Sequence, residues 1–518
     1  MSQKARGLNA YEASFIFLLI STAVAVFSRT VADPDLWGHV RFGEDLWLTG
    51  KIIRPDPYSY LTANQLWINH EWLAEGIFYL AYATAGPLGL VVLKTGISVI
   101  IVVLLCVHLR RQGLSPVRVG TVLMLGAIIL LPYLALVRPQ AFTFLFFLLL
   151  LLIVSRLERG DYRWLWAIPF IFAVWVNMHG GFLAGIGILL LWSAIHLSSI
   201  LTSKSSPRVL FNASNLPYFF APLFAVVGTL LNPYGPELLR FLLRTATGPR
   251  KDIAEWQPLV LMSPEGMIYL PLLVVSLIGV LYSRKERRPA MVFLFLVLCI
   301  MPHVASRHLP LFALGALVLT AEHIADVWER HSPGSAAGSS DAPRSLFKPW
   351  ATGLNCILAI LLLGLSAQNF HCIPISPATA NFPARAIALL RDSGLSGNLV
   401  THFGWGEYAL WHLGPRIKVS IDGRRETVYP EKIYNDSWAF MLGLGDWDAI
   451  LREGPADIVL VGKQFQAFNL MTLRHDWHLV YEDTFAALFV PSGSTIVDKI
   501  RSTQAREIPP NGTGACFP

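Results

Sequence analysis

Long apolar runs recur along the first 370 residues of this chain, and no other feature limits its fold so strongly. They lie near residues 11–28, 89–108, 119–136, 140–155, 164–178, 181–199, 215–231, 267–283, 289–302, 309–326 and 350–368. About 20 apolar residues in a helix match the hydrocarbon thickness of a bilayer. Charged residues make up only 14% of the chain, against about 25% in an average soluble protein. The sequence therefore predicts a polytopic α-helical membrane protein with about eleven transmembrane helices.

One further stretch, residues 72–86, decides the topology. It contains Glu75 and is only about three-quarters of a span long, so we expect it to lie at the membrane interface. One set of loops then carries 17 Lys and Arg in 67 residues, and the opposite set carries 10 in 107. Because positively charged loops stay in the cytoplasm, the sequence predicts a cytoplasmic N-terminus and a C-terminus outside the inner membrane.

The net charge of +7 resembles that of a nucleic-acid-binding protein, but its distribution does not. The Lys and Arg residues cluster in short loops between apolar runs, which is the pattern of membrane topology and not of a binding patch. We therefore expect the lipid bilayer, and no nucleic acid, as a partner. Few polar residues lie deep in the spans, which argues against an ion-coupled transporter.

The pattern changes after residue 375, where short β-rich runs alternate with helical stretches. The runs are residues 398–402, 417–422, 457–461, 478–483 and 486–490. Such alternation predicts a small α/β domain. We therefore expect a transmembrane domain over residues 1–370, with interfacial helices in an outer loop at 29–88, and an extracytoplasmic α/β domain over 371–518.

Two cysteines, Cys372 and Cys516, bracket the expected α/β domain. They can form a disulfide if the domain faces an oxidising compartment, but spacing alone does not show that they are close. Within the domain, Asp422 and Arg424 follow a predicted strand. Loops at this position commonly carry ligands in α/β sheets; the alternative is an ion pair that closes a turn.

The first outer loop holds the densest set of polar residues. It opens with Asp33-Pro34-Asp35 directly after the first apolar run, and His70-Glu71 follow further along. Two carboxylates two residues apart, held by proline at a membrane surface, suit a general base or a divalent-cation site. The alternative is that Asp33 or Asp35 simply caps the following helix.

Other predicted outer loops place cationic and imidazole groups on the same side of the membrane. Arg138 follows the third span, and His179 separates the fifth and sixth. Arg307 and His308 lie between the ninth and tenth. Ionisable groups at this depth usually face a water-filled cavity, and these Arg and His side chains suit a phosphate. For each one alone, the alternative is a solvated turn or a snorkelling anchor.

Together these motifs resemble the GT-C membrane glycosyltransferases, and more closely a bacterial branch of that superfamily. The matching stretches cover nearly the whole chain and are Asp33-Pro-Asp-Leu-Trp37, Asp56-Pro-Tyr-Ser-Tyr60, His70-Glu-Trp-Leu-Ala-Glu75, Trp175-Val-Asn-Met-His-Gly-Gly181, Leu231-Asn-Pro-Tyr-Gly235, Gly404-Trp-Gly-Glu-Tyr408 and Ile421-Asp-Gly-Arg424. The resemblance implies an inverting enzyme that transfers a sugar from a polyprenyl-phosphate-linked donor to an envelope acceptor on the outer face.

The resemblance also implies roles for individual residues. Asp33 or Asp35 would be the catalytic base that deprotonates the acceptor. Cationic groups would stabilise the leaving lipid phosphate, and the full set of candidate substrate-binding residues is Arg138, His179, Arg307, His308, His70 and Glu71. The resemblance does not specify a metal, so the expected cofactor is at most a divalent cation.

Two other functions stay open at this point. A non-catalytic membrane component of envelope polysaccharide assembly or export would tolerate substitutions in the acidic loop. A transporter would keep its flux after loss of the outer carboxylates. The C-terminal domain has neither a GxGxxG motif nor a P-loop, which argues against an independent nucleotide-binding enzyme.

Overall fold

The computed structural model describes residues 9–202, 212, 215–245, 250, 253–331, 344–375, 382–503 and 516–518. They form two compact units. Unit 1 comprises Met1–Arg29, Val91–Ala135 and Pro139–His371, and unit 2 comprises Thr30–Leu90, Leu136–Arg138 and Cys372–Pro518. Each unit has its own buried core.

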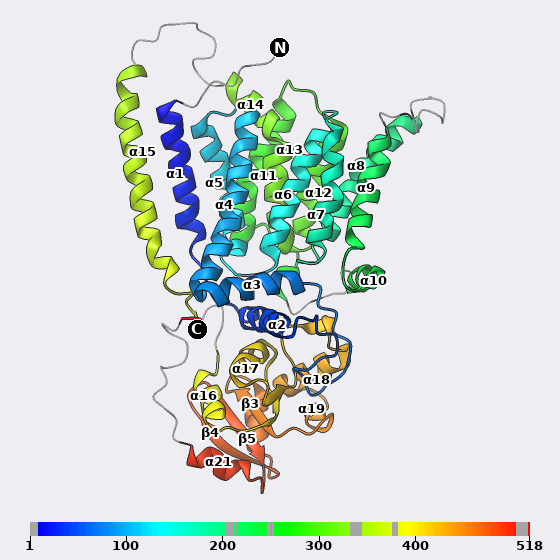
Figure 1. The fold of residues 1–518 in the computed structure, drawn as a ribbon, viewed down its shortest axis with the longest axis vertical. Coiled ribbons are helices and arrows are strands. Elements are labelled where there is room, and N and C mark those ends of the chain that lie inside the picture. The colour runs from blue at the N-terminus through cyan, green and yellow to red at the C-terminus, as the bar shows by residue number, and fades with distance from the viewer. Residues whose placement is uncertain are drawn as a thin grey trace. The chain divides into compact units, whose positions relative to one another are not determined.

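Unit 1 is a bundle of mostly apolar helices that lie side by side, except that the short helix α10 lies across their direction (Figure 1). They are α1 (Ala10–Phe27), α4 (Pro87–Arg111), α5 (Pro116–Leu134), α6 (Gln140–Leu157), α7 (Ala167–Trp175), α8 (Phe182–Thr202), α9 (Leu216–Thr229), α10 (Pro236–Thr245), α11 (Pro264–Tyr282), α12 (Pro289–Ile300), α13 (Leu309–Leu319), α14 (Ala321–Arg330) and α15 (Arg344–Ser366). Every predicted apolar run coincides with helical residues.

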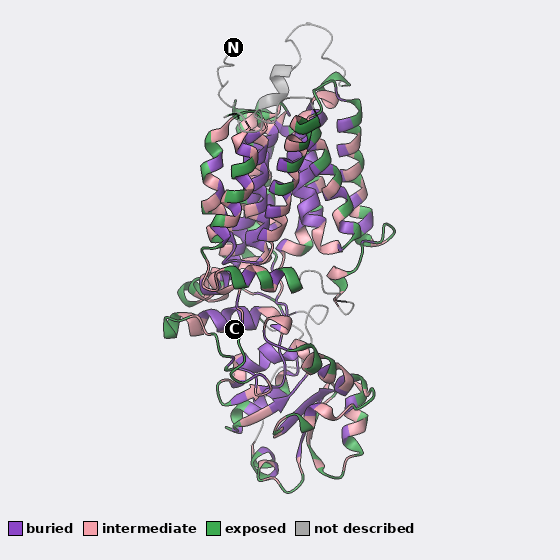
Figure 2. Cartoon of the chain, turned by 90° about the vertical axis from the view of Figure 1, so that its right-hand side faces the viewer, coloured by how far each residue is buried: buried purple, intermediate pink, exposed green. Residues whose placement is uncertain are grey.

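Within the described residues, seven helices are long and apolar enough to cross a membrane, or eight if the bent pair formed by residues 306–319 and 321–330 is one span. The polytopic α-helical class is thus confirmed, and the count of eleven spans stays a prediction. Buried residues follow the sides of the helices that face one another (Figure 2). Close approach needs small residues: a Cβ on Gly126 of α5 would lie 2.5 Å from Leu317 Cδ1 of α13.

Unit 2 contains a five-stranded sheet of order β2-β1-β3-β5-β4. The strands are β1 (Gly397–Val400), β2 (Ile417–Val419), β3 (Ile458–Gly462), β4 (Trp477–Glu482) and β5 (Ala486–Pro491). β1 runs parallel to β2 and β3, and β5 runs antiparallel to β3 and β4. Each strand coincides with a predicted β-rich run, so the α/β class of this region is confirmed.

Unit 2 also contains helices, two from the first loop and the others from the C-terminal segment. They are α2 (Asp35–Thr49), α3 (Trp72–Ala85), α16 (Ala384–Asp392), α17 (Gly406–Leu413), α18 (Glu431–Leu442), α19 (Ala449–Arg452), α20 (Gln466–Thr472) and α21 (Ile496–Ser502). Phe440 of α18 and Met471 of α20 are buried against Val459 of β3 and Phe489 of β5. This apolar layer is the core of unit 2.

The first loop, which we expected to belong to the transmembrane domain, forms one unit with the C-terminal segment. Its backbone extends the sheet beside β2. The Val419 N–H donates to Tyr58 O at 3.1 Å, and the Tyr60 N–H donates to Val419 O at 3.2 Å. These bonds cover an otherwise open sheet edge. Residues 72–86, which we expected to lie at the membrane interface, form α3. This helix contacts α2 through a hydrogen bond that Trp47 Nε1 donates to Gly76 O at 2.8 Å.

The beginning and end of the C-terminal segment are joined by a disulfide between Cys372 and Cys516, with 5.3 Å between their Cα atoms. Beside it, the Phe517 N–H donates to Ile373 O at 2.9 Å. The ring of Phe517 lies 5.1 Å from that of Trp37 in α2. The pairing that the sequence left open is therefore present, and it fixes the chain end against the first loop.

This disulfide predicts a thiol count. The chain has five cysteines, of which Cys106, Cys299 and Cys356 are free. Alkylation of the denatured, unreduced protein should therefore modify three thiols, and prior reduction should raise the number to five, as read by intact mass. A Cys372→Ser variant should show four thiols with or without reduction. Five modified thiols in the unreduced wild-type protein would contradict the pairing.

Candidate functional site

The two predicted catalytic carboxylates share one arginine in unit 2. Arg138 Nε donates to Asp33 Oδ2, and Arg138 Nη2 lies 2.9 Å from Asp35 Oδ2. Pro34 precedes α2 without a side-chain capping bond, so the alternative that Asp33 or Asp35 caps this helix is not seen. The structure thus brings Arg138 to the pair of carboxylates that the sequence singled out in a different loop.

The two carboxylates differ in exposure, which separates their roles. The Asp33 side chain is 4% exposed and that of Asp35 is 32% exposed. Burial raises the pKa of Asp33, against the opposing charge of Arg138. A general base must reach the proton that it removes. Asp35 is thus accessible from solvent, whereas Asp33 is enclosed beside Arg138.

A third carboxyl group, Glu407 of α17, lies beside this pair. It is buried, and its Oε2 has no hydrogen-bond partner among the described residues. Burial, followed by the charges of Asp35 and Asp422, raises the pKa of Glu407 well above its usual range. A shift in this direction favours the protonated carboxyl group, which can donate a hydrogen bond.

Two glycines make room for Glu407. A Cβ on Gly38 of α2 would lie 2.1 Å from Glu407 Oε2. A Cβ on Gly423 would lie 2.6 Å from Glu407 Oε1 and 3.0 Å from Asp35 Oδ1. Our sequence analysis missed Glu407 as a site residue. The available signal was Gly38, because a glycine inside a helical stretch commonly marks a close approach.

A buried ion network joins the first loop to the sheet. Arg424 Nη1 donates to Asp56 Oδ1 at 2.7 Å, and Arg424 Nη2 donates to Asp422 Oδ2 at 2.7 Å. Tyr429 also donates to Asp422 Oδ2, at 2.8 Å. Burial opposes the charged form of Arg424, but Asp422 and its other neighbours raise its pKa well above the usual range. The ion pair between Asp422 and Arg424, one of the two alternatives that the sequence left open, is present, and Asp56 adds a second carboxylate that the sequence did not connect with it.

A second candidate group lies between α2 and α3: His39, Glu71 and Glu75, whose ligand atoms are within 4.8 Å of one another. Burial alone lowers the pKa of His39, but its contact with Glu75 and the charge of Glu71 outweigh burial and raise it. Burial raises the pKa of Glu71 to about 7, against the opposing charge of His39. His70 Nε2 lies 3.6 Å from Glu71 Oε1. These side chains form the kind of set that holds a divalent cation.

The remaining predicted residues belong to unit 1. His179 Nδ1 accepts from the Gly181 N–H at 3.0 Å and lies 2.9 Å from Thr143 Oγ1. The Arg307 guanidinium lies 4.3 Å from the centre of the Trp256 ring, and His308 Nδ1 lies 3.1 Å from Met301 O. The contacts with Gly181 and Met301 are local, whereas those with Thr143 and Trp256 join segments that are distant in the sequence. The predicted roles toward a phosphate stay predictions.

Two solved structures with TM-scores above 0.5 are similar to this chain in fold. No family model matches the chain, and no curated protein is similar to it in sequence. The solved structure of the Archaeoglobus fulgidus oligosaccharyltransferase in the apo form is similar to it, with 13% identity, a TM-score of 0.57, and coverage of 87% of this chain and 69% of that one. The same enzyme tethered to an acceptor peptide gives 12% identity, the same coverage and a TM-score of 0.53. ArnT from Cupriavidus metallidurans gives 12% identity over 92% of this chain and 97% of that one, with a TM-score of 0.49.

The oligosaccharyltransferase likeness shows the fold. The chain shares the fold of that solved structure, and it combines apolar helices long enough to cross a membrane with a five-stranded sheet. The expected fold class is therefore confirmed. Because a fold of this kind can carry different chemistries, the activity is argued below from the site.

Proposed function

We propose that this protein is a membrane glycosyltransferase that takes its sugar from a polyprenyl-phosphate-linked donor and delivers it to an envelope acceptor. The observation that carries the proposal is Asp35, a partly exposed carboxylate at the start of α2 that Arg138 holds at 2.9 Å. It stands in the first loop of a GT-C fold. Such a fixed, accessible carboxylate suits removal of a proton from an acceptor.

The chemistry is a single displacement with inversion. Asp35 takes the proton of the acceptor hydroxyl, and the acceptor oxygen bonds to the anomeric carbon of the sugar. The bond from that carbon to the lipid phosphate oxygen breaks, and its electron pair leaves with the phosphate. Asp35 must therefore be ionised and close to the acceptor in the reactive complex.

Neighbours of Asp35 have positioning roles in this proposal. Asp33 and Arg138 fix the orientation of its carboxylate through two ion pairs. Glu407, with its raised pKa, supplies a neutral carboxyl group beside it, which avoids a third negative charge at the base.

The proposed location is a bacterial inner membrane, with the N-terminus in the cytoplasm and unit 2 outside. The charge bias of the loops supports this orientation. The disulfide between Cys372 and Cys516 supports it independently, because disulfides persist in oxidising compartments.

The proposal predicts lipid-dependent transfer by the purified protein. Full-length protein in lipid nanodiscs, given a panel of radiolabelled polyprenyl-phosphate sugars and an envelope extract, should move label from the lipid phase into the acceptor fraction with one of them. Nucleotide sugars of the same composition should not replace the lipid donor. Absence of transfer with every donor, from protein that keeps its disulfide and its monodisperse gel-filtration profile, would contradict the proposal and favour the non-catalytic alternative.

A further inference from the structure

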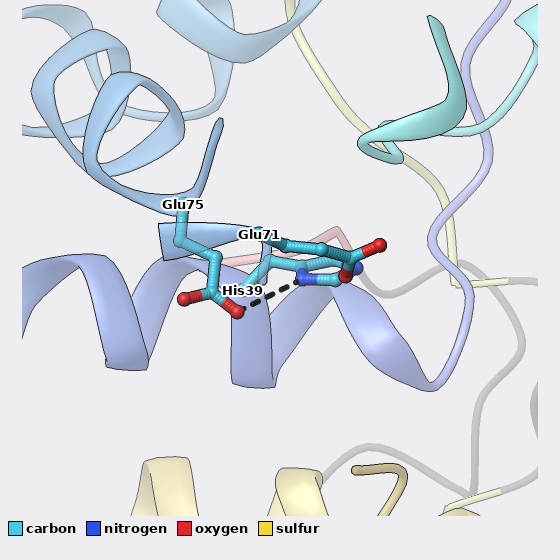
Figure 3. A group of neighbouring side chains, drawn as sticks. All are labelled: His39, Glu71 and Glu75. Carbon is cyan, nitrogen blue, oxygen red and sulfur yellow. Dashed lines mark ion pairs between the residues drawn. The ribbon is translucent and has the colours of Figure 1, made fainter. Parts of the chain in front are cut away.

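Three potential metal ligands converge where α2 meets the beginning of α3. His39 lies in α2, Glu71 directly precedes α3, and Glu75 lies one turn further along the same helix. Residues four apart share a helix face, so both carboxylates point toward His39 (Figure 3). The ligand atoms lie within 4.8 Å of one another. Ligands of one zinc ion at about 2.0–2.2 Å would be separated by about 3–4 Å, so small side-chain movements suffice to close the set.

The charges of this cluster call for a cation. His39 and Glu75 are buried, and Glu71 is partly buried. Two carboxylates held this close repel each other in a medium of low dielectric constant. The positive charges of His39 and Arg138 act on Glu71, and a divalent cation between the carboxylates would oppose their repulsion directly.

His39 provides an independent indication of a ligand. Its Nδ1 atom is buried and has no hydrogen-bond partner among the described residues. The nearest carboxylate oxygen, Glu75 Oε1, is 3.6 Å away, which is too long for a good hydrogen bond. A buried nitrogen without a hydrogen bond costs about 1–3 kcal/mol. A metal ion between this nitrogen and the two carboxylates would remove that cost.

Asn69 holds both carboxylate-bearing residues in place. Its Nδ2 donates to Glu75 Oε2 at 2.5 Å, and its Oδ1 accepts from the Glu71 N–H at 3.1 Å. The hydrogen bond from Asn69 engages Oε2 of Glu75, and the other carboxylate oxygen, Oε1, is the one nearest to His39 Nδ1. Outer partners of this kind orient the ligands of metal sites.

We propose that His39 Nδ1, a carboxylate oxygen of Glu71 and Glu75 Oε1 bind one divalent transition-metal ion, of the Zn²⁺ or Mn²⁺ class. An imidazole with two carboxylates suits these ions better than Mg²⁺ or Ca²⁺, which prefer oxygen ligands alone. Three protein ligands leave a coordination position open for water or substrate. The site is separate from the pair formed by Asp33 and Asp35, and the binding of the ion does not depend on the proposed transferase activity.

Metal content tests this site directly. Full-length protein in detergent is stripped with a chelator, dialysed against Zn²⁺ or Mn²⁺ alone, and analysed by mass spectrometry of the metal and by titration calorimetry. We expect one tightly bound ion per chain. Glu75→Gln and His39→Gln should each weaken binding at least about 100-fold, and Asn69→Ala about 10–100-fold, as for an outer partner. Co²⁺ bound in place of the ion should show a visible spectrum that changes in these variants.

Matched variants keep the test decisive. Glu44→Gln changes a carboxylate of the same helix that pairs with Arg41 at 2.9 Å, and it should bind metal like the wild type. If Glu75→Gln does not fold, Glu71→Gln replaces it in the same comparison. Absence of a bound ion in the wild type, or unchanged affinity in folded Glu71→Gln and His39→Gln proteins, would overturn the proposal in favour of an ion pair between His39 and Glu75. If sugar transfer persists after complete removal of the metal, the proposed function still holds and the ion has only a structural role.

Discussion

Replacement of Asp35 by asparagine is expected to lower sugar transfer by about 10²–10⁴-fold, the usual contribution of general acid–base catalysis. The amide has the shape of the carboxylate and can still accept from Arg138, but it cannot take a proton from the acceptor. The loss should therefore appear in kcat at saturating donor and acceptor, with KM little changed. Transfer of label from the lipid donor in nanodiscs measures it.

Two further variants make this result specific. Asp33→Asn should have a smaller effect, because Asp33 is buried and acts through Arg138. Glu44→Gln, on the same helix and paired with Arg41, should retain full activity. Full activity in both Asp35→Asn and Asp33→Asn would exclude the catalytic role. A large loss in Asp33→Asn alone would transfer the role of base to Asp33.

The second large effect concerns stability. Arg424→Met should lower the free energy of unfolding of unit 2 by about 3–5 kcal/mol, the usual cost of breaking a buried ion pair from one side. The substitution would leave Asp56 and Asp422 buried without their shared cation. It would also remove the guanidinium from the rings of Tyr58 and Trp67, at 4.9 and 4.8 Å.

Urea unfolding in detergent micelles, followed by tryptophan fluorescence, gives the comparison. Arg416→Met is the control, because Arg416 is exposed and its Nη2 makes a long hydrogen bond of 3.4 Å to Arg391 O. Adding Asp56→Asn and Asp422→Asn to Arg424→Met should recover part of the loss, since the uncompensated charges are then gone. Equal unfolding midpoints for Arg424→Met and Arg416→Met would show that the network adds no stability.

Local patterns in the sequence predicted the elements of this fold well. The apolar runs became helices, and all five β-rich runs became strands. The ion pair of Asp422 with Arg424 was also predictable, because the two residues are neighbours in one turn. The meeting of Asp33, Asp35 and Arg138 followed from a different argument, their common side in the charge-based topology.

What the sequence could not supply were contacts between distant segments. The addition of residues 58–60 to the edge of β2 depends on backbone hydrogen bonds, which leave no side-chain pattern. Glu407 looked like part of a turn motif, and only the tertiary structure places it beside Gly38. His39 was overlooked because a single histidine in a helix gives no metal-ligand spacing until Glu71 and Glu75 are brought next to it.

The bond between Asp56 and Arg424 spans 368 residues, and this has a consequence for biosynthesis. At about 5–20 residues per second, a ribosome needs about 20–70 s to make the stretch between them. During that time the first loop has already left the ribosome, but β2 and Arg424, which contact it in the folded protein, have not yet been made. The environment of Asp35 is therefore among the last parts of the molecule to form. A truncated chain that ends before the sheet would contain the proposed base Asp35, but it would lack the residues of the C-terminal segment that surround this base in the folded protein.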